Sequence, residues 1–213
     1  MEKKLLQCLI APLTIVIIPA LGNVSILAAP QLWILLCIGL LSSIVQPKYH
    51  VIREKSNVID KGTEVQIIWS VYITQFLAIL EATYVRYPDS VKWDIISTVT
   101  LLVMIFGFIL RAWAVHALGK YFTMHLSILD DHKLIQNGPY KYIRHPAYAG
   151  AFLTYVGTTV FLHAWYSFML ALILLPAAWL RRIYVEENLL FNAFGEKYIL
   201  FSQSVKRTIP YLW

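Results

Sequence analysis

Apolar residues are gathered into six runs along this chain, which cover residues 5–21, 31–46, 65–84, 93–115, 147–163 and 167–181. The runs approach the roughly 20 residues that an α-helix needs to cross a bilayer. The pattern therefore predicts an all-α integral membrane protein with about five to six transmembrane helices. Only residues 163–166 separate the last two runs, so we expect the last two helices to form a hairpin. Both of these runs are somewhat short, and whether both fully span stays open.

The composition agrees with this fold class, because 59% of the 213 residues are hydrophobic and only 14% are charged. Soluble domains are about 45–50% apolar and about 25% charged. Cys8 and Cys37 lie inside apolar runs, so neither a disulfide framework nor a zinc site is expected. No cleavage site of the A-x-A kind follows the first run, so we expect no removable signal peptide. Residues 1–213 are predicted to form one membrane domain, with transmembrane helices in 1–115 and the cofactor-binding, catalytic half in 116–213.

Basic residues are distributed unevenly between the two sides of the predicted membrane. If the N-terminus is cytoplasmic, only Arg86 and Lys92 of the 18 Lys and Arg residues fall in outside loops. Under the positive-inside rule this asymmetry places both termini, the 116–146 loop and the 182–213 tail in the cytoplasm. The host membrane would be a bacterial inner membrane or the endoplasmic reticulum. The basic residues that give the net charge of +6 flank the predicted membrane segments, so no nucleic-acid partner is expected.

A polar, ring-rich stretch at 138–150, G-P-Y-K-Y-I-R-H-P-A-Y-A-G, lies at the start of the fifth apolar run. Its Gly-Pro pair is typical of a turn, and Pro146 suits the first turn of a helix. We therefore expect the fifth helix to begin at His145 or Pro146. The free backbone N–H groups there, with Arg144 beside them, would attract an anion. The alternative is that these residues only anchor the chain at the membrane interface.

A second polar cluster, formed by Arg181, Arg182, Glu186 and Glu187, follows the sixth apolar run. If the sixth helix continues, Arg182 and Glu186 lie one turn apart on one face and can pair. The predicted hairpin returns the chain to the same side of the membrane, so the two clusters can converge. Together they would suit a zwitterionic, aromatic ligand. A solvated helix end with basic anchors is the alternative.

Two kinds of site are not expected from the sequence. No familiar metal-ligand spacing occurs among the five histidines considered, His116, His125, His132, His145 and His163. Glycine-rich phosphate loops of the Rossmann or Walker kind are also missing from the sequence. A nucleotide-like cofactor must therefore be held in another way, and no metal is predicted.

Between residues 110 and 210 the chain resembles the isoprenylcysteine carboxyl methyltransferases and the related membrane phospholipid N-methyltransferases. The matching motifs, in order, are L-G-x-x-F-T at 118–123, H-x-L-I at 132–135, G-P-Y at 138–140, R-H-P-x-Y-x-G at 144–150, R-x-x-x-E-E at 182–187 and F-G-x-x-Y at 194–198. The resemblance implies S-adenosylmethionine as the methyl donor, bound in a cytoplasm-facing pocket over the last two helices.

The resemblance also implies roles for individual residues, and the physical argument above adds Arg144 as a partner for the cofactor's carboxylate. The predicted cofactor-binding residues are His125, His132, Lys133, Leu134, Ile135, Tyr140, Arg144, His145, Pro146, Ala147, Tyr148 and Glu186. Arg182 would bind the acceptor, and Arg182 and Glu187 are the predicted catalytic residues. A prenylcysteine carboxylate is already ionised and needs only orientation, whereas an amine or thiol needs a base such as Glu187.

The acceptor, a lipid or a small molecule, stays open at this stage, and the sequence predicts no oligomeric state. Two other functions also stay open. A sterol-type reductase of the membrane would use NADPH in a similar C-terminal half. A non-enzymatic membrane protein, such as a scaffold or a transporter subunit, would carry polar residues along a pathway through the bilayer. Binding of S-adenosylmethionine, NADPH or neither separates the three.

Overall fold

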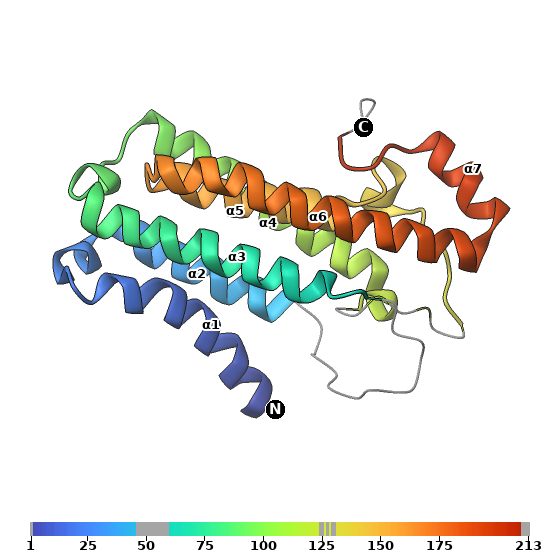
Figure 1. Cartoon of the computed structure of the whole chain (residues 1–213), viewed down its shortest axis with the longest axis horizontal. Coiled ribbons are helices and arrows are strands. Elements are labelled where there is room, and N and C mark those ends of the chain that lie inside the picture. Colours follow the sequence, from blue (N-terminus) through green and yellow to red (C-terminus); the bar gives the residue numbers. More distant parts are fainter. Residues whose placement is uncertain (1, 46–59, 124–125, 127, 129–130, 210–213) are drawn as a thin grey trace.

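The structure is a computed structural model that describes residues 2–45, 60–123, 126, 128 and 131–209. These residues form the α-helices α1 (Glu2–Ala20), α2 (Pro30–Val45), α3 (Thr63–Leu80), α4 (Ile95–Leu118), α5 (Pro146–Phe161), α6 (Trp165–Phe194) and α7 (Glu196–Ser204) (Figure 1). Short 3-10 turns join several of them, and a π-helical turn, Glu81–Val85, extends α3. No β-strand occurs in the described residues beyond one isolated bridge between Ile143 and Lys206.

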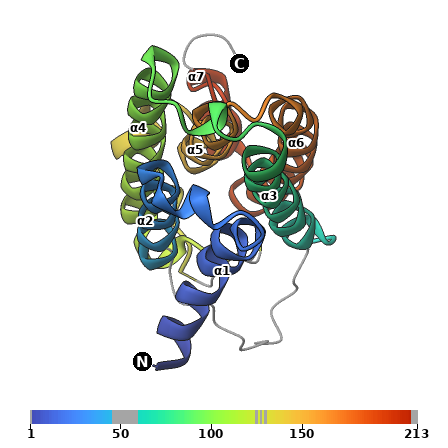
Figure 2. The same cartoon turned by 90° about the vertical axis from the view of Figure 1, so that its left-hand side faces the viewer.

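Helices α1 to α6 lie side by side as a bundle, and α7 lies at one end of it (Figures 1 and 2). The main neighbours are α4 with α5, α3 with α6, and α1 with both α2 and α3. The all-α fold predicted from the sequence is confirmed for the described residues.

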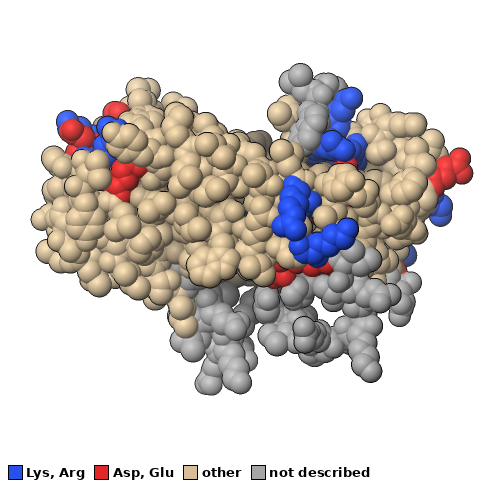
Figure 3. Space-filling view, in the orientation of Figure 1, with Lys and Arg blue, Asp and Glu red and all other residues tan. Residues whose placement is uncertain are grey.

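Among the described residues, three helical segments are long and apolar enough to cross a membrane, Thr63–Val85, Ile95–Tyr121 and Trp165–Phe194, and α2 is a shorter apolar helix. Large apolar side chains such as Leu102, Phe106 and Ile173 point outward from these helices and are exposed. In Figure 3 charged residues lie at the left-hand end of this face and over its right-hand half, and a band without them lies between. In water such a surface would be unfavourable, whereas lipid tails cover it at no cost.

The start of α5 agrees with the sequence prediction, whereas α6 ends later than the apolar run predicted. Helix α5 begins at Pro146 with His145 as its N-cap residue, as expected. Helix α6 continues to Phe194, well past the apolar run that ends at 181. Arg182, Glu186 and Glu187 therefore lie on a continuous helix, which fixes their relative directions.

Helices α4 and α5 approach so closely that their backbones touch at two glycines. A Cβ atom on Gly107 would lie 2.7 Å from the carbonyl oxygen of Gly150. A Cβ atom on Gly150 would lie 2.7 Å from the backbone nitrogen of Arg111. Small residues at such a crossing let two membrane helices pack backbone to backbone. This contact fixes the first turns of α5, which carry the R-H-P-x-Y-x-G motif, against α4.

At the end of the bundle away from α7, two carboxylates accept hydrogen bonds from backbone N–H groups in the first turns of helices. Glu81 accepts hydrogen bonds from the backbone nitrogens of Tyr166 and Ser167, at 3.1 and 2.8 Å, at the start of α6. Asp94 is the N-cap of α4, and its second oxygen lies 3.1 Å from Nε2 of His163. Both carboxylates satisfy free backbone N–H groups, which is the usual role of an acid at a helix start.

Candidate active site

A cavity of about 380 Å³ extends through the bundle and has two differently lined parts. The first part, here called the polar pocket, is lined by His132, Lys133, Leu134, Ile135, Tyr140, His145, Tyr148 and Glu186 and by Tyr198 and Phe201 of α7. The second part, here called the apolar arm, is lined by Ile15, Val16, Leu35, Ile38, Ile67, Val71, Ile79, Ala151 and Tyr155. Glu64 and Ile79 both line the cavity and are about 22 Å apart along α3, at about 1.5 Å per residue.

Arg182 lies where the two parts meet, and Tyr148 joins it to Glu186. The Tyr148 hydroxyl donates a hydrogen bond to Oε2 of Glu186 at 2.6 Å and accepts one from Nε of Arg182 at 3.3 Å. The two clusters predicted to converge, one at the start of α5 and one on α6, therefore do so. Arg182 and Glu186 are connected through this tyrosine, whose hydroxyl fixes the position of both side chains.

Arg182 is also held by the start of α3, a contact that the sequence did not predict. Its Nη1 donates to the carboxylate of Asp60 and to Oγ1 of Thr63, the latter at 3.1 Å. Asp60 in turn accepts from the hydroxyl of Thr63 at 2.6 Å and from the backbone nitrogen of Glu64 at 3.2 Å. The signal was present in the sequence, since D-x-x-T-E directly before an apolar run is typical of a capped helix start. Nothing in the sequence indicated that Asp60 pairs with Arg182.

Asp60 and Arg182 are 8% and 4% exposed, so this ion pair is almost completely removed from solvent. Losing one partner of such a pair leaves a buried charge and costs about 3–5 kcal/mol. The pair therefore fixes the Arg182 guanidinium in one position between the polar pocket and the apolar arm.

Glu187 points to a different set of partners from Glu186. Its Oε1 accepts from Nε and Nη2 of Arg144 at 2.9 and 2.7 Å and lies 3.3 Å from Nε2 of His145. Its Oε2 accepts from Nε of Arg207 at 2.9 Å. Glu187 is not among the residues that line the cavity. The geometry therefore favours an ion-pairing role for Glu187 over the predicted role as a base, which stays a prediction.

Arg144 lines the cavity, but protein groups surround its guanidinium. Besides its two hydrogen bonds to Glu187, its Nη1 donates to the carbonyl oxygens of Ser202 and Val205, at 2.7 and 2.5 Å. The backbone nitrogens of Arg144 and His145 donate to the carbonyls of Lys206 and Arg207, both at 2.8 Å. The guanidinium and the backbone nitrogen of Arg144 thus donate to Glu187 and to the tail of the chain, which weakens the case for Arg144 as a cofactor ligand.

Aromatic rings form one wall of the polar pocket around His132. The rings of Tyr121 and His132 stack with centroids 4.9 Å apart, and Phe194 meets His132 edge-on at 5.7 Å. Burial lowers the pKa of His132, so its imidazole is neutral at pH 7. Its Nδ1 is buried and has no hydrogen-bond partner within the part of the chain that the structure describes.

Tyr140, within the turn Gly138–Lys141, also lines this pocket. Burial, followed by the nearby charge of Glu186, raises the pKa of Tyr140 well above its usual value. The hydroxyl therefore stays protonated and available as a hydrogen-bond donor at neutral pH.

The remaining predicted residues divide into three groups. Lys133, Leu134, Ile135 and Ala147 line the cavity. Pro146 is buried in the first turn of α5 and is not among the lining residues. His125 lies outside the described residues. In the described ranges, no group of three or more His, Cys, Asp or Glu side chains is placed to hold a metal ion.

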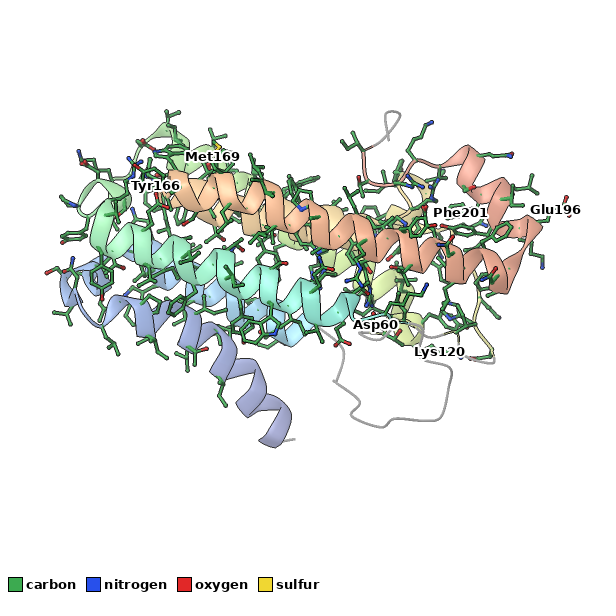
Figure 4. All side chains as sticks on the ribbon, in the orientation of Figure 1. Asp60, Lys120, Tyr166, Met169, Glu196 and Phe201 are labelled. Carbon is green, nitrogen blue, oxygen red and sulfur yellow. The ribbon has the colours of Figure 1, made fainter. Side chains whose placement is uncertain are left out.

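Figure 4 shows how the long α6 helix connects the two ends of the molecule. Tyr166 and Met169 lie at its start, Asp60 lies beside its middle at the start of α3, and Glu196 lies at the far end where α7 begins. The segment of α6 beyond Asp60 carries Glu186 and Glu187. It extends past the start of α3, and Tyr198 and Phe201 of α7 complete the polar pocket there.

Comparison with known proteins agrees with the resemblance seen in the sequence. A family model described as the isoprenylcysteine carboxyl methyltransferase family matches residues 98–192. A probable protein-S-isoprenylcysteine O-methyltransferase of Oryza sativa subsp. japonica is 33% identical over 128 residues, which are 59% of this chain and 67% of the relative. Protein-S-isoprenylcysteine O-methyltransferase B of Arabidopsis thaliana is 31% identical over 144 residues, which are 66% of this chain and 73% of the relative.

A solved structure of a eukaryotic intramembrane Ras methyltransferase, an isoprenylcysteine carboxyl methyltransferase, is similar to this fold with a TM-score of 0.54 and 26% identity. The match covers 97% of this chain and 74% of that protein. These findings support a methyltransferase and give no support to a reductase or a non-enzymatic protein. The chain is thus a multi-pass integral membrane protein and belongs to the isoprenylcysteine carboxyl methyltransferase family.

Proposed function

We propose that this chain transfers a methyl group from S-adenosylmethionine to the carboxylate of a prenylated cysteine at the cytoplasmic face of a membrane. The observation that carries the proposal is the shape of the cavity. A polar pocket suited to a zwitterionic cofactor and an apolar arm suited to a prenyl chain are parts of one space, with Arg182 where they meet. A carboxylate attached to a prenyl chain would reach Arg182 when the chain fills the arm.

The polar pocket fits the chemical groups of S-adenosylmethionine. Glu186 supplies a negative charge for the cofactor's cationic groups, and the faces of Tyr140 and Tyr148 can contact a sulfonium through cation–π attraction. The stacked rings at His132 offer a surface for adenine, and its Nδ1, which has no partner among the described residues, offers a hydrogen-bonding atom. When bound, the cofactor supplies an electrophilic methyl group, whose transfer to a carboxylate oxygen forms a C–O bond as the C–S bond breaks.

The apolar arm fits an isoprenoid chain better than a polar acceptor. Aliphatic residues from α1, α2 and α3 line most of it, so an apolar chain that enters it meets mainly apolar side chains. Since the exposed surfaces of α3, α4 and α6 are apolar, the prenyl chain would already be dissolved in the bilayer when it reaches the arm.

Arg182 would orient the acceptor carboxylate, and its own position is fixed by Asp60, Thr63 and Tyr148. No base is needed, because a carboxylate is ionised at neutral pH. This agrees with the engagement of Glu187 by Arg144 and Arg207. The contribution of the protein is then positioning and exclusion of water, which can supply about 7–11 kcal/mol.

The same proposal places the whole chain in the membrane. We take α1, α2 and α5 to cross the bilayer beside the three long helices, with α5 and α6 as a hairpin and both termini in the cytoplasm. Residues 1–115 and 116–213 then form one domain, because α1 to α3 and the C-terminal half line the same cavity. The concentration of basic residues on one side favours this orientation.

Cofactor binding is the first test. The full chain, purified in detergent, is titrated calorimetrically with S-adenosylmethionine, with its demethylated product and with NADPH. We expect saturable binding of the first two compounds and none of NADPH, and a loss of affinity of at least about tenfold in Glu186→Ala, since a charged hydrogen-bonding partner is removed.

Asp89→Ala is the control, because Asp89 is an exposed carboxylate at the opposite end of the bundle. Its affinity should equal that of the wild type. Binding of NADPH alone, or an unchanged dissociation constant in Glu186→Ala, would contradict the proposed cofactor pocket.

A further inference from the structure

The C-terminal segment 196–207 crosses over the start of α5 and is fastened there by main-chain and side-chain contacts. Residues Ile143 and Lys206 form a parallel bridge, and the backbone nitrogens of Arg144 and His145 donate to the tail carbonyls at 2.8 Å. We call this segment the C-terminal strap. It begins directly after Gly195, whose positive φ of 54° turns the chain back from the end of α6.

Charged side chains reinforce this contact, and Glu187 is their common partner. Arg144 joins the start of α5 to Glu187 on α6, and Arg207 joins the strap to the same carboxylate at 2.9 Å. Arg144 also reaches the strap directly through two carbonyl oxygens. The Arg144 and Glu187 side chains are only 9% and 12% exposed, so this ion pair is shielded from solvent. One carboxylate therefore connects α5, α6 and the strap.

The strap also forms part of the polar pocket. Tyr198 and Phe201 of α7 are buried, line the cavity and contact each other with ring centroids 6.3 Å apart. Burial, with the nearby charge of Glu187, raises the pKa of Tyr198 above its usual value, so the ring stays neutral. A displacement of the strap would remove these two rings from the wall of the pocket and open it to water.

We propose that Glu187, Arg144 and Arg207 are positioning residues that keep the strap closed over the bound cofactor and so set its rate of release. The proposal rests on the proposed function, because it takes S-adenosylmethionine as the ligand of the polar pocket. It assigns Glu187 to closure of the pocket and not to proton transfer. The acceptor side of the cavity is formed by Arg182 and the apolar arm. It is lined by residues other than Glu187, Arg144 and Arg207.

The test compares Arg207→Ala with Lys206→Ala in the full chain. Arg207 contributes a side-chain ion pair to Glu187, whereas the side chain of the adjacent Lys206 is exposed and only its backbone carbonyl is used. Dissociation of tritiated S-adenosylmethionine is followed after a chase with unlabelled cofactor. We expect release about tenfold faster in Arg207→Ala, since a charged hydrogen bond is lost, and wild-type release in Lys206→Ala.

The KM values for the cofactor and for the acceptor distinguish a loss of strap closure from a general loss of structure. In Arg207→Ala the KM for the cofactor should rise while the KM for the prenylcysteine acceptor stays at the wild-type value. Arg207→Lys, which keeps the charge, should restore most of the slow release. Unchanged release in Arg207→Ala, or equal rises in both KM values, would overturn the proposal.

Hydrogen exchange gives a readout that needs no turnover. The backbone amides of Arg144 and His145 should exchange faster in Arg207→Ala than in the wild type, because the strap protects them. Addition of S-adenosylmethionine should slow their exchange in the wild type. If the wild-type protein does not bind the cofactor at all, the proposed function fails. If it binds and these amides exchange equally in both proteins, only the strap proposal fails.

Discussion

The two adjacent acids of the E-E motif have different partners, although they are neighbours on one helix. Glu186 faces the cavity and accepts from the Tyr148 hydroxyl, whereas Glu187 turns toward Arg144 and the tail. Successive residues on an α-helix are about 100° apart around its axis, so the two side chains leave the helix in different directions. The sequence predicted Glu186 as a cofactor ligand and Glu187 as a catalytic residue, and in the structure only Glu186 lines the cavity.

Arg182 is the residue on which methyl transfer should depend most. In Arg182→Lys the positive charge is kept, but a lysine cannot reproduce the several directed hydrogen bonds that join Arg182 to Asp60, Thr63 and Tyr148. We expect kcat to fall about 100-fold, as when an aligned charge-stabilising donor is lost, with the dissociation constant of the cofactor within about twofold of wild type.

The measurement for this variant is single-turnover methyl transfer together with cofactor titration. Arg182→Ala should abolish transfer, but it also leaves Asp60 as a buried unpaired carboxylate, so its folding must be checked by thermal unfolding. A wild-type rate in Arg182→Lys would show that only the charge matters, and a wild-type rate in Arg182→Ala would remove Arg182 from the mechanism.

At the level of elements, hydrophobic periodicity and turn residues predicted the features that depend on neighbouring residues, namely the helices and the start of α5. The apolar runs became helices, and the proline at 146 marked the first turn of α5. The antiparallel return of the chain also brought Tyr148 and Glu186 together, as the predicted convergence required. These features depend on spacing within one or two neighbouring segments, which the sequence displays directly.

Contacts between distant segments were not predictable in the same way. Arg182 pairs with Asp60, which is 122 positions away, and the tail pairs with the backbone at 143–145. Which carboxylate meets which arginine depends on how α3 packs against α6, and no periodicity encodes that choice. The contacts of the Arg144 guanidinium with the strap carbonyls were not predicted for the same reason, and its role as a cofactor ligand stays a prediction.

The close crossing of α4 and α5 gives a prediction about α5, whose first turns contain the end of the polar stretch at 138–150. Gly150→Ala places a methyl group against the backbone of α4, where no side chain can move aside. Overpacking of this kind costs about 1–3 kcal/mol, whereas Gly→Ala inside a helix is otherwise favourable by about 0.5–1 kcal/mol. We expect a lower unfolding temperature and reduced methyl transfer.

Gly107→Ala tests the same contact from the opposite helix, because its Cβ atom would meet the carbonyl of Gly150. Both variants should lose stability, measured by thermal unfolding in detergent. If both unfold at or above the wild-type temperature, the backbone contact does not set the position of α5.

On the scale of the whole molecule, the two halves of the chain supply different parts of the cavity. The matched family region, residues 98–192, contains most of the polar pocket, whereas α1, α2 and α3 supply most of the apolar arm. Under the proposed function, the C-terminal half would supply most cofactor contacts and Arg182 for the acceptor carboxylate, and the N-terminal half most of the surface for the prenyl chain. The N-terminal half showed only membrane-helix patterns in the sequence, because an aliphatic wall for a ligand has the same composition as a helix in lipid.

The central claim is that one cavity joins a methyl donor to a prenylcysteine carboxylate. It is tested most directly by reconstituting the purified chain in phospholipid vesicles with S-adenosylmethionine labelled in its methyl group. N-acetyl-S-farnesylcysteine is the acceptor, and N-acetyl-S-methylcysteine, which lacks the prenyl chain, is the control. The expected result is label in a base-labile methyl ester of the farnesyl compound only. Label in an amine of the vesicle lipids with no ester formed, or equal transfer to both cysteine compounds, would contradict the claim.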